Sequence, residues 1–80
     1  GWQLAGDRIR KHFRFVDFRA AMAFVNAMAA VAEEEGHHPD FCVHYSTVNV
    51  EIWTHASGGL TENDFILAAK IDRVPGAVPG

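Results

Sequence analysis

The sequence predicts an α+β fold in which an antiparallel sheet carries helices on one face. An alternating strand pattern is followed by a long helical pattern, then by two more alternating patterns and a second helical pattern. The connections leave no room for the crossovers that parallel strands need, and a one-sided sheet must bury its apolar face against helices. With only 80 residues, we expect one domain over residues 1–80, with residues 75–80 as a flexible tail.

Residues 8–15 are predicted to form the first clear strand, because apolar and polar side chains alternate along them. The apolar face carries Ile9, Phe13 and Phe15, and the polar face carries Arg8, Arg10, His12 and Arg14. Residues 1–4, GWQL, are expected to be a short strand or an extended arm, with residues 5–7 as the turn.

The longest helix is expected between Asp17 and Gly36. Asp17 is a typical N-cap residue, and glycine commonly follows the last turn of a helix. The apolar residues between them recur at helical spacing: Phe18, Ala21, Met22, Val25, Met28, Ala29 and Ala32.

An antiparallel hairpin and a second helix are expected to complete the domain. After Pro39 the first strand of the hairpin places three side chains on one face, namely Phe41, Val43 and Tyr45. The second strand places Val48, Val50 and Ile52 on one face. The following helix has Thr61 as its N-cap and Asp64 three residues later, a spacing typical of a capping box.

Composition excludes several classes of function. The net charge is −3, and four of the seven basic residues lie in residues 8–14, where their alternation fits the solvent face of a strand better than a nucleic-acid surface. No apolar run approaches the roughly 20 residues of a membrane span. Because the single Cys42 cannot form an internal disulfide, we expect a reducing, cytoplasmic location. A chain this short is also expected to self-associate.

Three of the five histidines fall where the backbone changes direction. His37 and His38 follow the long helix, and His55 follows the last strand. Functional sites tend to collect at such ends, whereas His12 and His44 lie within strands and are expected to be ordinary surface residues.

Neither a metal site nor a cysteine nucleophile is expected. Adjacent residues of an extended chain point in opposite directions, and the sequence has no Cys-x-x-Cys or His-x-x-x-His pair. Cys42 lies in mid-strand among apolar neighbours, which predicts a buried, unreactive thiol.

General acid/base chemistry fits the histidines better, because the ordinary pKa of imidazole, about 6.5, lies near neutral pH. His37 at the C-terminal end of a helix is favoured in its charged form, and Glu33 lies one turn earlier. The other interpretation is that His37 only caps the last carbonyl groups of the helix. Spacing alone does not separate the two.

An ordered set of residues resembles the pterin-4a-carbinolamine dehydratase (4a-hydroxytetrahydrobiopterin dehydratase) family. The set comprises Glu33, His-His-Pro at 37–39, Tyr45, Thr-His at 54–55 and Asp64 after GGLTEN. The resemblance extends upstream through GW, FRFVDF and the alanine-rich helix, so it covers nearly the whole chain.

The resemblance implies a four-stranded antiparallel sheet with helices on one face, assembled into a homodimer or homotetramer. It also implies removal of water from 4a-hydroxytetrahydrobiopterin to give quinonoid dihydropterin, in tetrahydrobiopterin recycling and without a cofactor. His37 and His55 would transfer protons, and His38 would mainly bind and orient the substrate. Pro39 and Asp64 would belong to the same substrate site.

Several alternatives stay open at this point. Asp64 is also explained by helix capping alone, and Glu33 by a solvated helix end. Trp2 and Trp53 could stack on a pterin, but aromatic residues on a sheet more often serve packing. From another class, a non-catalytic protein-binding or dimerisation module, similar to a transcriptional coactivator, would keep the same fold. Intact histidines at 37, 38 and 55 favour the enzyme.

Overall fold

The computed structural model describes residues 1–54 and 59–79. Its elements follow in the order predicted from the sequence, preceded by a short strand directly after Trp2. They are β1 (Gln3–Ala5), β2 (Arg8–Arg14), α1 (Phe18–Glu35), β3 (Asp40–His44), β4 (Thr47–Ile52) and α2 (Glu62–Asp72).

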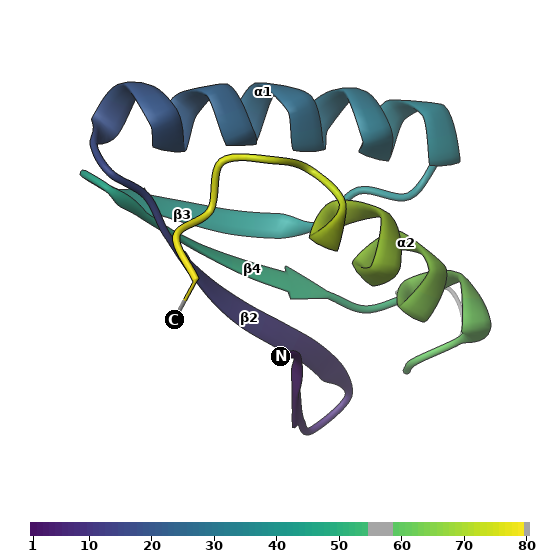
Figure 1. Ribbon diagram of the computed structural model, residues 1–80. Helices are drawn as coiled ribbons and strands as arrows, with labels where there is room; N and C mark the ends of the chain where they lie inside the picture. Colours follow the sequence, from purple (N-terminus) through teal and green to yellow (C-terminus); the bar gives the residue numbers. More distant parts are fainter. Residues whose placement is uncertain (55–58, 80) are drawn as a thin grey trace.

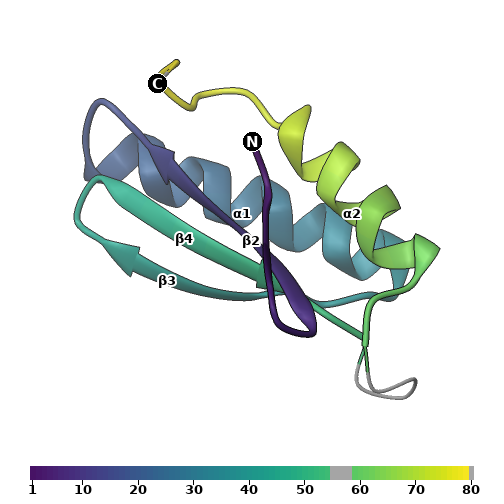
Figure 2. The same cartoon turned by 90° about the horizontal axis from the view of Figure 1, so that it is seen from below.

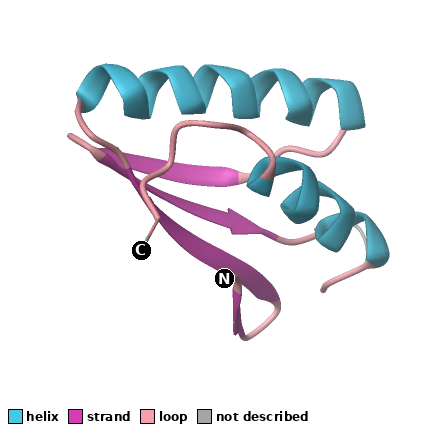
Figure 3. Cartoon of the chain, viewed as in Figure 1, coloured by secondary structure: helices cyan, strands magenta, loops and turns pink. Residues whose placement is uncertain are grey.

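In the described part of the chain the strands form a four-stranded sheet in the order β1-β2-β4-β3, and each neighbouring pair is antiparallel. Both helices lie on the same side of this sheet, with α1 running along it and α2 beside α1 (Figures 1 and 3). This arrangement confirms the predicted α+β fold with helices on one face.

The core lies between the helices and the sheet because the strand register aligns the apolar positions. Ile9 pairs with Ile52 and Phe13 pairs with Val48, so their side chains share the helix-facing side. Phe24 of α1 packs on this layer, with its ring centroid 4.8 Å from that of Phe13. Val48, Val50 and Ile52 of β4 are fully buried.

The opposite face of the sheet is covered by neither helix, as Figure 2 shows from below. His12 of β2 contacts Asn49 of β4 on this face, as expected for a surface histidine. Cys42 pairs in register with Asn49 and is exposed. The prediction of a buried thiol is therefore wrong: the neighbours of Cys42 in sequence are apolar, but its own side chain falls on the polar face of the strand.

The end of β3 also differs from the expected pattern. The strand ends at His44, and Tyr45 lies in the turn to β4 with a positive φ of 50°. Tyr45 is 71% exposed and, being outside the strand, does not continue the face that Phe41 and Val43 share. Its place in the turn puts it at the end of β3 opposite to His37 and His38.

The last residues of the described chain return to the sheet. Val74 packs against the core, and the backbone N–H of Val78 donates to the carbonyl oxygen of Arg14 at 2.7 Å. Asp72 at the end of α2 accepts hydrogen bonds from Lys11 and from the indole of Trp2. Among the described residues, neither helix is long and apolar enough to cross a membrane.

Candidate active site

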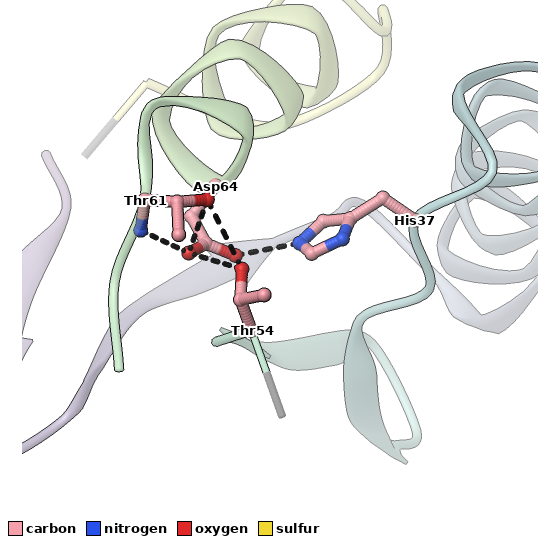
Figure 4. A network of polar contacts seen from close by, with 4 residues as sticks. All are labelled: His37, Thr54, Thr61 and Asp64. Atoms are coloured by element: carbon pink, nitrogen blue, oxygen red, sulfur yellow. Dashed lines mark hydrogen bonds and ion pairs between the residues drawn. The ribbon is translucent and has the colours of Figure 1, made fainter. Parts of the chain in front are cut away.

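The end of α1 fixes the position of the first predicted site residue. Gly36 adopts a left-handed backbone with a φ of 64°, which glycine accommodates without strain. The backbone N–H of the next residue, His37, donates to the carbonyl oxygen of Ala32 at 3.1 Å. The chain thus turns off the helix axis, and the side chain of His37 points toward α2 (Figure 4).

Asp64 reaches the same place from the first turn of α2. Its Oδ2 accepts the backbone N–H of Thr61 at 2.7 Å, as the capping-box spacing predicted. The side chain of Asp64 is fully buried. A helix cap therefore places a carboxylate inside the protein, at the end of α1.

His37 and Asp64 form a close pair, with 2.5 Å between Nε2 of the histidine and Oδ1 of the aspartate. The other carboxylate oxygen also accepts the hydroxyl of Thr54 at 2.7 Å. An ionised carboxylate can only accept hydrogen bonds, so Nε2 of His37 must carry a proton. In a neutral imidazole the second nitrogen, Nδ1, is then the basic atom.

The surroundings of Asp64 keep it ionised. Burial by itself would raise the pKa of the carboxyl group, but the N–H of Thr61, the hydroxyl of Thr54 and the ring of His37 together outweigh burial and lower this pKa below its usual value. The carboxylate is therefore charged near neutral pH and holds one tautomer of His37. Asp64 thus acts both as a helix cap and as the partner of His37.

Thr54 belongs to the Thr-His pair of the motif but was given no role of its own, although it contributes to this network. Its hydroxyl donates to Asp64 and lies 3.2 Å from the hydroxyl of Thr61 (Figure 4). A threonine just after β4 carries no pattern that distinguishes it from a strand residue. The only available signal was its position beside His55 in the Thr-His pair.

His38 has a different partner and a different environment. Its Nε2 contacts Oε2 of Glu33, and both side chains are mostly exposed. Glu33 therefore pairs with His38, whereas the sequence placed it within reach of His37. The reason is the left-handed turn at Gly36, which directs His37 toward α2 and leaves His38 on the side of α1.

A cavity of about 450 Å³ brings several of the predicted residues together, and this volume is typical of small-molecule sites. It is lined by Gly36, His37, His38, Pro39, Asp40, Trp53 and Thr54. For Trp53 the sequence favoured packing over stacking on a ligand, and the structure places it in the lining of this cavity. A larger cavity of about 700 Å³ lies on the uncovered face of the sheet and includes none of the predicted site residues.

The third predicted histidine, His55, lies outside the described residues. It directly follows Thr54 in the sequence. Within residues 1–54 and 59–79, no three His, Cys, Asp or Glu side chains gather closely enough to hold a metal ion. The described part of the site thus consists of a partly buried histidine paired with a buried aspartate, an exposed histidine and an aromatic ring.

This fold and this site define a class: α+β proteins with a histidine–carboxylate pair where two helices and a hairpin meet. The family model described as "Pterin 4 alpha carbinolamine dehydratase" matches residues 1–74. The chain belongs to this family, as its sequence motifs predicted.

Curated relatives agree with the family match. A protein of Nitrosomonas eutropha, described as "Putative pterin-4-alpha-carbinolamine dehydratase", is 57% identical over 74 residues, which are 92% of this chain and 66% of the relative. A protein of Dechloromonas aromatica with the same description is 53% identical over the same shares of the two chains. The chain spans about two thirds of the length of these relatives.

Solved structures confirm the fold. A protein from Brucella melitensis, described as "transcriptional coactivator/pterin dehydratase", superposes with a TM-score of 0.89 at 36% identity, over 95% of this chain and 83% of that one. A "pterin dehydratase-like protein", described as a RuBisCO assembly factor in the alpha-carboxysome, has a TM-score of 0.77 at 28% identity, over 98% and 90% of the two chains.

Proposed function

We propose that this chain is a hydro-lyase that removes water from 4a-hydroxytetrahydrobiopterin, giving quinonoid dihydropterin in tetrahydrobiopterin recycling. The observation that carries the proposal is the pairing of partly buried His37, which lines a cavity of small-molecule size, with fully buried Asp64, in a chain of the pterin-4a-carbinolamine dehydratase family. The single Cys42, which cannot form an internal disulfide, supports a cytoplasmic location.

The reaction needs one proton donor and one proton acceptor. The bond between C4a and its hydroxyl oxygen breaks, and the hydroxyl group leaves as water after receiving a proton. N5 of the ring loses a proton, and the electrons of that N–H bond form the new double bond between N5 and C4a. No electrons enter or leave the substrate, so two imidazoles are sufficient for the chemistry.

We assign the proton transfers to His37 and His55. Asp64 keeps the proton of His37 on Nε2, which makes Nδ1 the atom that exchanges a proton with substrate. His38 binds and orients the pterin from the exposed side of the cavity. Pro39 fixes the direction in which the chain leaves the two histidines.

The direct test is to follow dehydration of freshly generated 4a-hydroxytetrahydropterin, with the uncatalysed rate subtracted. The chain should accelerate this reaction, and His37→Ala should remove most of the acceleration. His44→Ala is the matched control, because His44 is an exposed histidine at the far end of β3. A folded chain that leaves the background rate unchanged would disprove the proposal.

That negative result would favour the second candidate, a non-catalytic protein-binding module. Two solved relatives are described as a transcriptional coactivator/pterin dehydratase and as a RuBisCO assembly factor. The dehydratase is the better supported function because helix capping accounts for Asp64 but not for His37, whose ring is held against that carboxylate while it lines the cavity. Pterin and further copies of this chain are the proposed partners, with neither nucleic acid nor membrane among them.

A further inference from the structure

Trp53 lies at the end of the sheet beside the proposed site, and Arg8 of β2 stacks on its indole ring. The guanidinium carbon of Arg8 lies 4.0 Å from the centre of the indole ring, a typical cation–π distance. Arg8 opens β2, and Trp53 directly follows β4, the neighbouring strand in the sheet. The stacked pair therefore extends the contact between β2 and β4 by one residue on each strand, beyond the pair of Ile9 and Ile52.

Arg8 is itself held in place by two carboxylates. Its Nη1 donates to Glu51 at 2.8 Å, and its Nε contacts Asp7 at 3.3 Å. The hydrogen bond to Glu51, and to a smaller extent the one to Asp7, raises the pKa of Arg8 above its usual value. Glu51 is two residues before Trp53 on the same chain, so the carboxylate and the indole fix the guanidinium together.

Trp53 also adjoins the residues that follow α1, among them His37 and His38. Asp40 pairs with Glu51 in the antiparallel register of β3 and β4. This pairing brings the residues just before β3 alongside those just after β4. Trp53 consequently lines the cavity together with His37, His38 and Pro39.

We propose that the indole of Trp53 is the aromatic wall on which the flat pterin ring packs, and that Arg8 is a positioning residue that holds this wall. The inference rests on the proposed function, because it takes a pterin as the ligand. A planar bicyclic ring gains binding free energy from a parallel aromatic surface. The indole has no group that titrates near neutral pH, so its contribution is to binding and not to proton transfer.

A binding assay can isolate Trp53 because the chain contains only one other tryptophan, Trp2. The Trp2→Phe variant leaves Trp53 as the single indole. Titration with 7,8-dihydropterin, a pterin without the 4a-hydroxyl group, should quench its fluorescence and give a Kd. Kinetic assays with the 4a-hydroxy substrate then separate KM from kcat.

Substitutions at Trp53 test the wall itself. Trp53→Ala should raise Kd and KM by roughly 5- to 100-fold, measured for Kd by calorimetry, since the fluorescent ring is gone. Its kcat should stay within about threefold of the unmutated value. Trp53→Phe should keep most of the affinity because it retains an aromatic face. Trp2→Phe is the matched control and should bind as the unmutated chain does.

Substitutions in β2 test the positioning residue. Arg8→Ala should raise Kd by about two- to fivefold and shift the emission of Trp53 in the Trp2→Phe background. Arg10→Ala is the matched control, because it removes the same charge from the same face of β2 without contacting Trp53. Equal effects of Arg8→Ala and Arg10→Ala would overturn the role of Arg8.

The outcomes distinguish this inference from the proposed function. If the unmutated chain neither binds dihydropterin nor accelerates dehydration, the proposed function fails. If the unmutated chain does both and Trp53→Ala, checked for folding by its thermal transition, binds as tightly, the aromatic wall is disproved while the function stands. A loss of affinity confined to the Trp53 and Arg8 variants supports the inference.

Discussion

Nε2 of His37 lies 2.5 Å from Oδ1 of Asp64, although 27 positions separate the two residues in the sequence. One residue follows α1 and the other belongs to the first turn of α2, so the pair joins the adjacent ends of two helices. An ion pair between Glu35 and Lys70, with 2.6 Å between Oε2 and Nζ, links the end of α1 to the last turn of α2. The geometry of the site therefore depends on how the helices pack.

Removing either proton-transfer histidine should mainly lower kcat. We expect His37→Ala and His55→Ala each to reduce kcat by roughly 10²- to 10⁴-fold, because each removes a general acid or base. Asp64→Asn should reduce kcat by on the order of 10²-fold, since an amide no longer fixes the tautomer of His37. Steady-state kinetics corrected for background measure all three. An unchanged kcat in His37→Ala would contradict the assignment.

Stability in acid should depend on Asp64. Its pKa is lower in the folded chain than the value of about 3.9 in the unfolded chain, so the unfolded state takes up the proton more readily. The stabilisation is fully present when the pH is well above the unfolded value of about 3.9, and it is lost as the pH falls through the lower, folded value. Urea unfolding at a series of pH values should show a steeper acid loss for the unmutated chain than for Asp64→Asn.

Thr54→Val provides a matched comparison for that experiment. It keeps the carboxyl group but removes one hydrogen bond that lowers the pKa of Asp64. Its acid profile should therefore lie between those of the unmutated chain and of Asp64→Asn. Parallel profiles for all three chains would show that Asp64 is not the responsible group.

His38→Ala should raise KM more than it lowers kcat, because His38 is assigned to binding. The pair that His38 forms with Glu33 is exposed, and such pairs contribute about 0–1 kcal/mol to the free energy of unfolding. Glu33→Gln should accordingly change stability by less than about 1 kcal/mol. A deep loss of kcat with unchanged KM in His38→Ala would reverse the roles of the two histidines.

Activity should be independent of added or bound metal. The proposed mechanism uses only imidazole protons, and the sequence lacks the usual ligand pairs. Dialysis against a chelator should leave kcat and KM unchanged. Loss of turnover that zinc restores would contradict this prediction.

The chain should form dimers or tetramers in solution. Large apolar side chains are exposed on its surface, among them Leu4, Phe41 and Phe65. A chain this small has little core of its own, and burying such residues between copies would add to it. Sedimentation at micromolar concentration should report the oligomer, and a uniform monomer would be the contrary result.

Periodicity was enough to predict most of the fold. The alternation in residues 8–15 placed Ile9 and Phe13 on the buried face, and the N-cap at Asp17 with Gly36 bounded α1. Tyr45 was misplaced because alternation does not show where a strand stops and a turn with positive φ begins. Cys42 was wrongly expected to be buried because the sequence did not show which face of β3, an edge strand, carries its side chain.

The site was only partly predictable. Motif position predicted His37, His38, Pro39 and Asp64 as site residues, because the order of residues in a family motif can be read from the sequence alone. The pairing of Glu33 with His38 and the place of Trp53 beside Arg8 arise from contacts through space. No local pattern encodes such contacts, which depend on the turn at Gly36 and on strand register.

The double use of the Asp64 carboxylate bears on how related sequences are interpreted. A relative that lost catalysis would still be stabilised by an acid at this position, since Oδ2 accepts the N–H of Thr61 at the start of the second helix. An aspartate found there is therefore a sign of folding and says nothing about turnover. His37 makes no such contribution to the helix through its ring, so the histidine is the residue to inspect when active members are separated from scaffolds.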